Sequence, residues 1–196
     1  MNIAFTVVAV AVVLFAGWKW YIDSQTQEAE TVSFQAVYYF EADSLNKALN
    51  GDGNNIGFLD IVDSYGMTPT GNLAKFYVGV IYLKQGKFEE AIESLKSYGS
   101  SDLLVQARAY SLIGDAYTEL KQFEDAVKYY QKASDYKPNK EFTPTYLLKL
   151  ALAQEKSNNL ESALSTYNTI LEEYPNTPAS NDAKREQGRI ESLLGK

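Results

Sequence analysis

The sequence predicts an all-α fold, in which a single N-terminal transmembrane helix precedes a solenoid of helix–turn–helix repeats. Two observations carry this prediction: a pattern of small and aromatic residues that recurs about every 35 positions, and an uncharged apolar run at the N-terminus. The first two copies of the pattern are Gly79, Tyr82, Gly86, Phe88, Ala91 and Gly114, Tyr117, Lys121, Phe123, Ala126. A looser third copy is Ala151, Gln154, Asn158, Leu160, Ala163. A period of this length is typical of stacked helix pairs, in which small residues let two helices approach closely. We therefore expect a binding surface.

The composition excludes several classes of function. The chain has 196 residues, 45% of them hydrophobic, and can bury a core without a disulfide or a metal. It contains no Cys and no His, which removes thiol nucleophiles, the commonest metal ligands and the usual general base. The net charge of −7 argues against nucleic-acid binding, because phosphate contacts need clustered Lys and Arg. With no phosphate-binding loop or nucleophile motif visible, we expect no catalysis, cofactor, metal or small-molecule substrate.

The N-terminal segment 1–22 is predicted to be a membrane anchor. Residues 2–18 carry no charge, and a helix over residues 3–22 would be about 30 Å long, the thickness of a bilayer core. The residues expected at one membrane interface are Trp18, Lys19, Trp20 and Tyr21. A cleaved signal peptide is the alternative, but there is no basic segment before the run, and Leu14-Phe15-Ala16 does not resemble an A-x-A cleavage site. The flanking charges leave the orientation open.

Residues 23–72 are predicted to form a degenerate capping repeat next to the membrane. Helical composition and spacing extend from Asp23 to Asn50, followed by a Gly- and Asn-rich loop over 51–55. A short apolar helix over 56–65 then leads to a turn at Thr68-Pro69-Thr70-Gly71.

Three repeats are expected over 73–101, 103–138 and 143–176. Each consists of two helices, which are separated by turns at 85–87, near 121 and at 157–159. A last helix over 178–194 carries many charges, the polar outer face expected of a terminal cap.

The repeats resemble tetratricopeptide repeats. In the second repeat the matching positions are Tyr110, Ile113, Gly114, Tyr117, Phe123, Ala126, Tyr130, Ala133 and Pro138, with Tyr110 in place of the usual Trp. The first repeat matches at Gly79, Tyr82, Phe88, Ala91 and Leu95, and the third keeps Ala163, Tyr167 and Pro175. These positions pack helix on helix, so the resemblance implies a fold without naming a partner.

A narrower resemblance covers essentially the whole chain. The order is one anchor, a long helix, the segments 48–55 and 57–61, then 71–74 and the repeat that begins with Gly79 and Tyr82. This order is similar to the YfgM family of Bacteroidetes-like bacteria. The resemblance implies an ancillary subunit of the SecYEG export channel, with its repeats on the exported side and a membrane-anchored PpiD-like chaperone as a second partner. Proteins of that family usually carry a basic tail before the anchor, which is absent from this sequence.

The concave wall of such a solenoid is built from the first helix of each pair. The repeat register places these residues on it: Leu73, Phe76, Val80 and Leu83 in the first repeat, Arg108, Ser111, Asp115 and Thr118 in the second, and Thr145, Leu148, Leu152 and Glu155 in the third. Two apolar stretches thus flank a polar centre, which suits an amphipathic or extended apolar partner segment. Alternatively, the helices before the repeats cover Phe76, Val80 and Leu83. Phe76, Val80 and Leu112 replace the Lys/Asn ring that clamps a C-terminal carboxylate, which argues against capture of heat-shock protein tails.

The sequence-based hypothesis is therefore a membrane-anchored adaptor of the Sec channel. It would lie in a bacterial inner membrane as a single-pass protein, with its repeats in the periplasm, and would recruit or position a PpiD-like chaperone. The alternatives are a generic envelope scaffold for cell-division or outer-membrane assembly complexes, and a holdase that binds unfolded clients directly.

Overall fold

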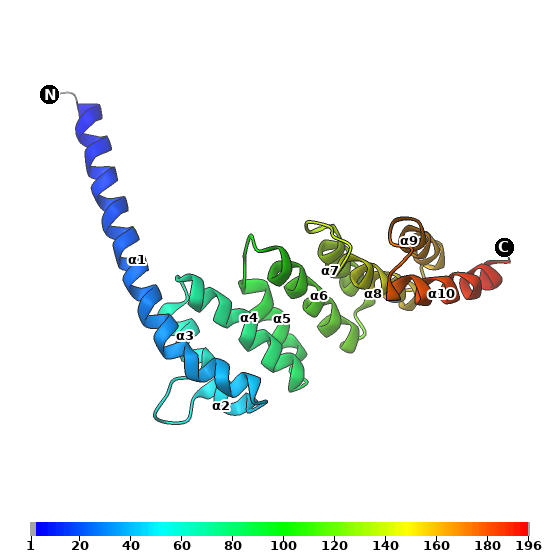
Figure 1. Cartoon of the computed structure of the whole chain (residues 1–196), viewed down its shortest axis with the longest axis horizontal. Helices are drawn as coiled ribbons and strands as arrows, with labels where there is room; N and C mark the ends of the chain where they lie inside the picture. The colour runs from blue at the N-terminus through cyan, green and yellow to red at the C-terminus, as the bar shows by residue number, and fades with distance from the viewer. Residues whose placement is uncertain (1–2, 196) are drawn as a thin grey trace. The chain divides into compact units, whose positions relative to one another are not determined.

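The computed structural model describes residues 3–195, which form ten α-helices and their connections, so the all-α repeat prediction is confirmed. The chain divides into two compact units, Met1–Ile81 and Tyr82–Lys196. The helices, labelled in Figure 1, are α1 Ile3–Glu41, α2 Leu45–Asn50, α3 Phe58–Tyr65, α4 Pro69–Lys84, α5 Phe88–Ser97, α6 Leu103–Glu119, α7 Phe123–Asp135, α8 Thr143–Lys156, α9 Leu160–Glu173 and α10 Pro178–Leu194.

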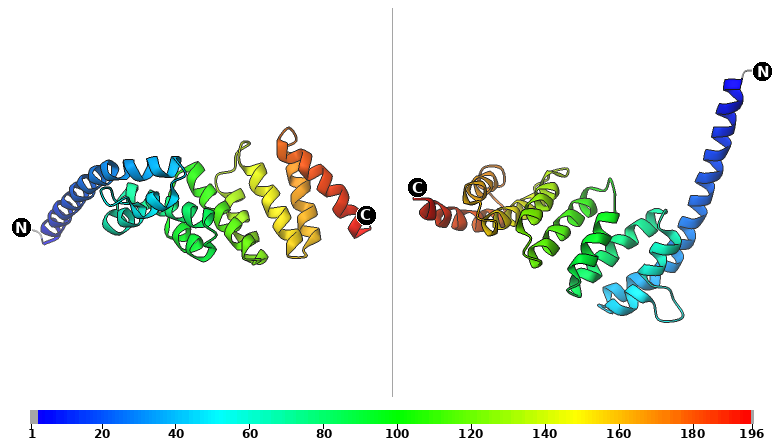
Figure 2. Two further views of the ribbon diagram at one scale, coloured as in Figure 1. Left: turned by 90° about the horizontal axis from the view of Figure 1, so that it is seen from below. Right: turned by 180° about the vertical axis from the view of Figure 1, so that it is seen from behind.

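Helix α1 is continuous from the apolar segment into the first unit. It packs against α2 and α3, and Figures 1 and 2 show its N-terminal half projecting beyond these two helices. The large apolar side chains from Val7 to Tyr21 are exposed, and Trp18 and Tyr21 lie 6.2 Å apart between ring centroids. By length and composition, α1 is the one helix among the described residues that could cross a membrane.

The helix predicted to continue to Asn50 ends earlier, at Glu41. Asp43 adopts a positive φ of 53°, a conformation that Asp tolerates better than most residues. The amide of Ser44 then bonds to the carbonyl of Tyr39 at 2.8 Å, which closes the helix end. This turn lets α2 pack against α1, and Ala48 and Leu49 of α2 are buried.

An aromatic cluster holds α1, α3 and α4 together in the first unit. The ring of Tyr77 in α4 stacks on Phe58 of α3 at 4.7 Å and meets the edge of Phe40 in α1 at 5.0 Å. Helix α4 begins at Pro69, within the segment predicted to be a turn. Proline is favoured in a first helical turn, and the Thr68 hydroxyl accepts a hydrogen bond from the Gly71 amide at 3.0 Å.

The second unit is a succession of packed helix pairs. Each helix from α5 to α10 packs against the next, and α8 also contacts α10. The same turn recurs after α4, α6 and α8. Its central residue is Gly86, Lys121 or Asn158, and each of the three has a positive φ. In each case the next amide bonds back to a carbonyl in the preceding helix, that of Tyr82, Tyr117 or Gln154. The sequence period is therefore a repeated backbone geometry.

Helix α10 follows the same register as α6 and α8. Gly188 and Gly195 each lie 37 positions after their counterparts in the third repeat, Ala151 and Asn158, and Gly195 again has a positive φ. Where α8 buries Leu147 and Leu150, α10 carries Lys184 and Gln187. Helix α10 thus has the register of a first helix of the repeat, with polar residues at two positions where α8 has buried leucines.

Candidate partner-binding surface

Side-chain contacts join the first helices of the second and third repeats to the C-terminal helix. Lys149 of α8 forms an ion pair with Asp115 of α6 at 2.7 Å, and Glu155 of α8 pairs with Arg189 of α10. These contacts place the outward side chains of α6, α8 and α10 on one surface. We call it the first-helix face, and it comprises Arg108, Asp115, Leu148, Lys149, Leu152, Glu155 and Arg189.

The polar centre of the first-helix face is bonded internally. The ammonium group of Lys149 donates to both carboxylate oxygens of Asp115, at 2.7 and 2.8 Å, and to the Ser111 hydroxyl at 3.3 Å. From α7, the Tyr130 hydroxyl donates to Asp115 at 2.7 Å. Burial, followed by the charge of Asp115, raises the pKa of Tyr130 above its usual range, so this hydroxyl remains a donor at neutral pH. Asp115 therefore positions its neighbours and is already engaged by two partners.

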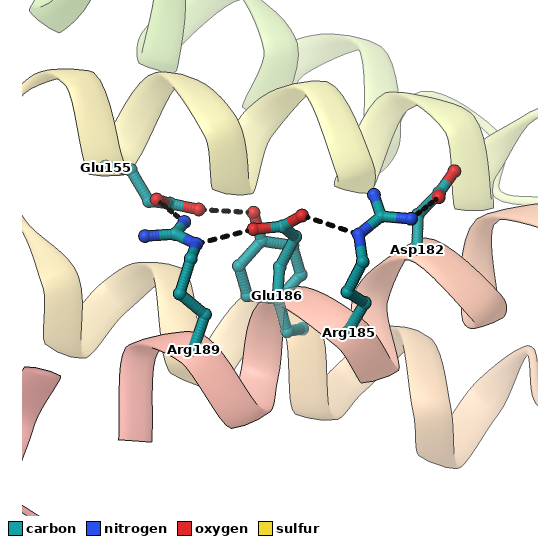
Figure 3. Close-up of polar contacts among 6 residues, drawn as sticks. Glu155, Asp182, Arg185, Glu186 and Arg189 are labelled. Carbon is teal, nitrogen blue, oxygen red and sulfur yellow. Dashed lines mark hydrogen bonds and ion pairs between the residues drawn. The ribbon is translucent and has the colours of Figure 1, made fainter. Parts of the chain in front are cut away.

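A chain of ion pairs fixes α10 at the end of the face (Figure 3). Glu186 accepts hydrogen bonds from Arg189 at 2.7 Å and Arg185 at 3.0 Å, and Arg185 also pairs with Asp182 at 2.9 Å. Arg189 reaches across to Glu155 of α8, whose carboxylate accepts a further bond from the Tyr167 hydroxyl at 2.5 Å. The side chains of Glu155 and Glu186 are only 12% and 17% exposed. The hydrogen bonds from Arg189 and Arg185 outweigh burial and lower the pKa of Glu186.

The part of the first-helix face that remains open combines apolar and cationic groups. Leu152 is 43% exposed and Leu148 is half-buried, while Arg108 and Thr145 are exposed. Two ordered polar clusters thus frame an apolar strip, an arrangement that can hold a partner segment by side-chain burial and contact with a positive charge.

The first repeat does not supply the open apolar stretch that the register predicted. Phe76 and Val80 are buried, with 9% and 8% of their surfaces exposed, whereas Leu73 is 37% exposed and Leu83 half-buried. Ser111 in the second repeat is also buried, at 3%. The burial of Phe76 and Val80 agrees with the alternative that other parts of the chain cover them, and Ser111 is likewise not open to a partner. Helical register identifies a face but does not reveal whether other parts of the chain cover it.

Sequence reasoning missed Lys149 and Tyr130 as members of this surface. Lys149 lies between the two leucines assigned to the face, and its charge is opposite to that of Asp115, 34 positions earlier. Opposite charges separated by one repeat length indicate an ion pair between neighbouring first helices, so the sequence did contain a signal for Lys149. Tyr130 belongs to a second helix, and its reach through to the first-helix face depends on tertiary packing.

A cleft of about 820 Å³ lies near the N-terminus of α8, with Thr145 in its lining. Its lining includes Glu141, Glu172 and Glu173 against one lysine, Lys140, and is therefore mainly acidic. Among the described residues, no group of three or more Asp, Glu, His or Cys side chains is arranged to hold a metal ion.

Comparison with known proteins gives the family. Two models of the tetratricopeptide repeat match residues 73–101 and 105–175, which together make up just over half of the chain. Over 101 residues the chain is 35% identical to the "Uncharacterized protein ycf37" of Guillardia theta. The match covers 49% of this chain and 55% of that relative, so the chain spans about half the length of the curated protein it matches.

Solved repeat proteins share the fold. TPR-like repeats assigned to a kinesin light chain of Podosopora anserina align with a TM-score of 0.66 at 14% identity, covering 87% of this chain and 88% of theirs. MamA from Desulfovibrio magneticus RS-1 aligns with a TM-score of 0.56 at 20% identity and covers 74% of both chains. At these identities the likeness concerns the fold alone. The family matches, the recurring turns and the paired helices establish that the chain belongs to the tetratricopeptide repeat proteins, a family of protein-interaction scaffolds.

Proposed function

We propose that this protein is a membrane-tethered adaptor, whose anchor holds a tetratricopeptide repeat array at a bilayer. The observation that carries this proposal is α1, in which an uncovered apolar half continues without a break into a helix packed against α2 and α3. Exposed valines, Leu14 and Phe15 are unfavourable in water, whereas insertion into a bilayer removes them from it. Repeats with their own polar cap do not need such a segment to fold. The segment therefore serves to hold the repeats at a membrane.

In this proposal, the first-helix face is where the protein partner binds. Arg108, Leu148 and Leu152 make the contacts, and the Asp115–Lys149 pair keeps α6 and α8 in register. Leu73 and Leu83 are further candidates from the first repeat. A partner helix or extended segment with apolar side chains next to an acidic residue would match the strip and its positive charge.

The more specific proposal is an accessory role at the Sec export channel. It is supported by the order of anchor, long helix and repeats, which resembles that of YfgM-like proteins. The chain would lie in a bacterial inner membrane with its repeats in the periplasm, contact SecYEG through the anchor and recruit a PpiD-like chaperone through the repeats.

Native purification in mild detergent tests this assignment. The full-length chain should co-purify with channel subunits and a membrane-anchored prolyl isomerase, and loss of residues 1–22 should release it from the channel. Recovery of division or outer-membrane assembly factors without channel subunits would favour a generic envelope scaffold. Recovery of unfolded exported proteins alone would favour a holdase. Protease treatment of spheroplasts should digest the repeats, and digestion only after lysis would contradict the periplasmic orientation.

Surface variants test the binding face itself. The double substitution Arg108→Glu and Leu152→Glu should weaken partner recovery without lowering helical content, because both side chains are exposed. Glu172→Lys, on an exposed position of α9, is the matched charge-reversal control. Equal partner recovery by the double variant and the control would show that the partner binds elsewhere.

A further inference from the structure

A second pocket lies in the same unit, away from the first-helix face. Its volume is about 370 Å³, and it is formed by α5, α6, α7 and the connection between α5 and α6. Aromatic and basic side chains dominate its lining, namely Lys96, Tyr98, Tyr110, Tyr129, Lys132 and Tyr136. We call it the Tyr129 pocket. The α6 residues that line it, Gln106, Tyr110 and Ile113, lie on a different side of that helix from Arg108, Ser111 and Asp115.

Two lysines converge on one aromatic ring of this pocket. The ammonium nitrogen of Lys132 lies 4.7 Å from the ring centroid of Tyr129, and that of Lys96 lies 5.4 Å from the same centroid. Tyr129 is itself stacked with Tyr117 at 5.5 Å. Lys96 donates a hydrogen bond to the Tyr117 hydroxyl at 2.7 Å, which raises the pKa of Lys96 and keeps it charged at neutral pH.

No carboxylate among residues 3–195 pairs with either lysine. The ion pairs of the second unit engage Lys128, Lys149, Arg185 and Arg189 instead. Asp102 lies at the nearby α6 N-terminus, where its Oδ1 atom accepts hydrogen bonds from the amides of Leu104 and Val105, each at 2.8 Å. Two like charges held around one ring repel each other unless an anion lies between them. In a chain of net charge −7, this local excess of positive charge is a specific feature of the pocket.

The walls of the pocket are ordered by their own hydrogen bonds. The Tyr136 hydroxyl donates to the carbonyl of Ser100 at 3.0 Å, and the Ser100 amide donates to the Gln106 side chain at 2.6 Å. The rings of Tyr110 and Tyr136 meet edge to face at 6.0 Å. These contacts tie the α5–α6 connection to α7, so the aromatic surface is formed before any ligand arrives.

We propose that the Tyr129 pocket binds an acidic peptide segment of a protein partner, with a carboxylate between Lys96 and Lys132 and a neighbouring apolar side chain against the tyrosine rings. Ammonium groups form strong charge-assisted hydrogen bonds with carboxylates. The rings provide a flat apolar surface that a peptide side chain can cover and that a small inorganic anion cannot use. The pocket is a second interaction site, and it does not depend on the proposed role of the first-helix face.

The test uses the full-length chain in detergent micelles and a library of capped hexapeptides that carry two Asp or Glu residues and four randomised positions. Selected peptides are resynthesised with Asn and Gln, and affinities are measured by fluorescence anisotropy. The double variant Lys96→Met and Lys132→Met keeps the aliphatic stems and removes both charges. Lys128→Met is the matched control. Lys128 is an exposed lysine of α7, the helix that also carries Lys132, and it pairs with Asp125.

We expect the double variant to weaken the selected peptides by about tenfold or more, and the control by less than about twofold. The amide peptides should bind correspondingly less tightly, and Arg108→Glu with Leu152→Glu should leave peptide affinity unchanged. The absence of any selected peptide, or equal affinity of the amide peptides, would overturn the proposal. Inorganic phosphate that binds as tightly as the peptides would show an anion site without peptide recognition. Peptide loss caused only by the Arg108 and Leu152 variant would assign the peptides to the first-helix face.

Discussion

At the scale of single residues, Gly114 decides how closely α6 and α7 pack. A Cβ atom at this position would lie 2.6 Å from Cε1 of Tyr130, well inside a normal contact. Tyr130 has little freedom to move, because its hydroxyl bonds to Asp115 and lies 3.2 Å from the Thr118 hydroxyl. The small residue in the repeat pattern is therefore required by the ring that comes 16 positions later.

Gly114→Ala should destabilise the second unit by about 1–3 kcal/mol, the usual cost of overpacking. Gly188→Ala is the matched control, since it lies at the corresponding position of α10 and its added Cβ would meet nothing within 4 Å. There the helix preference of alanine should add up to about 1 kcal/mol. Urea unfolding of the two variants measures both effects, and equal stabilities would contradict the packing argument.

Val80→Glu should lower stability by several kcal/mol, because Val80 is buried and an unpaired carboxylate there loses its hydration. Leu152→Glu, a similar exchange at an exposed position of the first-helix face, should change the melting temperature little. Thermal unfolding followed by circular dichroism distinguishes the two. A Val80→Glu protein as stable as the parent would mean that this residue faces solvent.

At the scale of elements, α10 depends on charges as well as on apolar contacts. Its buried residues are mostly small, Ala179, Ser180 and Ala183, with Ile190 as the large one. The ion-pair chain through Glu186 adds directional contacts to this modest apolar surface. Helix α10 should therefore be sensitive to acid.

The protection of α10 amides against hydrogen exchange should fall as the pH is lowered from about 5 to about 3. The pKa of Glu186 is depressed from its usual value near 4.5 by Arg189. Its contribution to stability is therefore complete above that value and is lost as the pH falls through the folded-state pKa. Glu186→Gln should reduce protection already at pH 6 and flatten the dependence in α10 relative to α6. An unchanged pH profile in this variant would show that Glu186 does not hold the helix.

At the scale of the whole molecule, the N-terminal half of α1 has an apolar surface, which differs from the charged and polar surface of the repeats. The charged residues lie beyond the apolar segment, beginning with Lys19 and Asp23, which pair with each other at 3.1 Å. Exposed large apolar side chains are concentrated in α1 from Val7 to Tyr21, whereas those of the repeats, such as Leu152, are fewer and more dispersed. Membrane attachment should therefore reside in α1 alone.

The full-length chain should float with liposomes in a density gradient, and a chain without residues 1–22 should remain at the bottom. The reason is that only the full-length chain contains the uncharged run over residues 2–18, which together with residues 19–22 is long enough to span a bilayer core as a helix. The control is the double variant Trp18→Ala with Trp20→Ala. It removes the interfacial rings, keeps the apolar length and should still float. Flotation of the shortened chain would show that the remaining residues have membrane affinity of their own.

The sequence by itself determined the helical class, the repeat period and the apolar N-terminal helix. These features depend on local rules: small residues at fixed spacing, turn residues such as Gly86 and Asn158 that accept positive φ, and an uncharged stretch of sufficient length. Each is readable because it needs no knowledge of what lies nearby in space. The short connection at Asp43 was missed although Asp43 and Ser44 are residue types common in turns and helix caps, because the helical spacing of apolar residues continues through it to Ala48.

The tertiary structure alone decided which first-helix residues are available to a partner. Phe76, Val80 and Ser111 have the correct helical register and are nevertheless buried, whereas Lys149 joins the face through its pair with Asp115. Burial and ion pairing depend on contacts between helices that are distant in sequence, and a periodic pattern does not contain them. The Tyr129 pocket arises in the same way, from three helices that bring Lys96 and Lys132 to one ring.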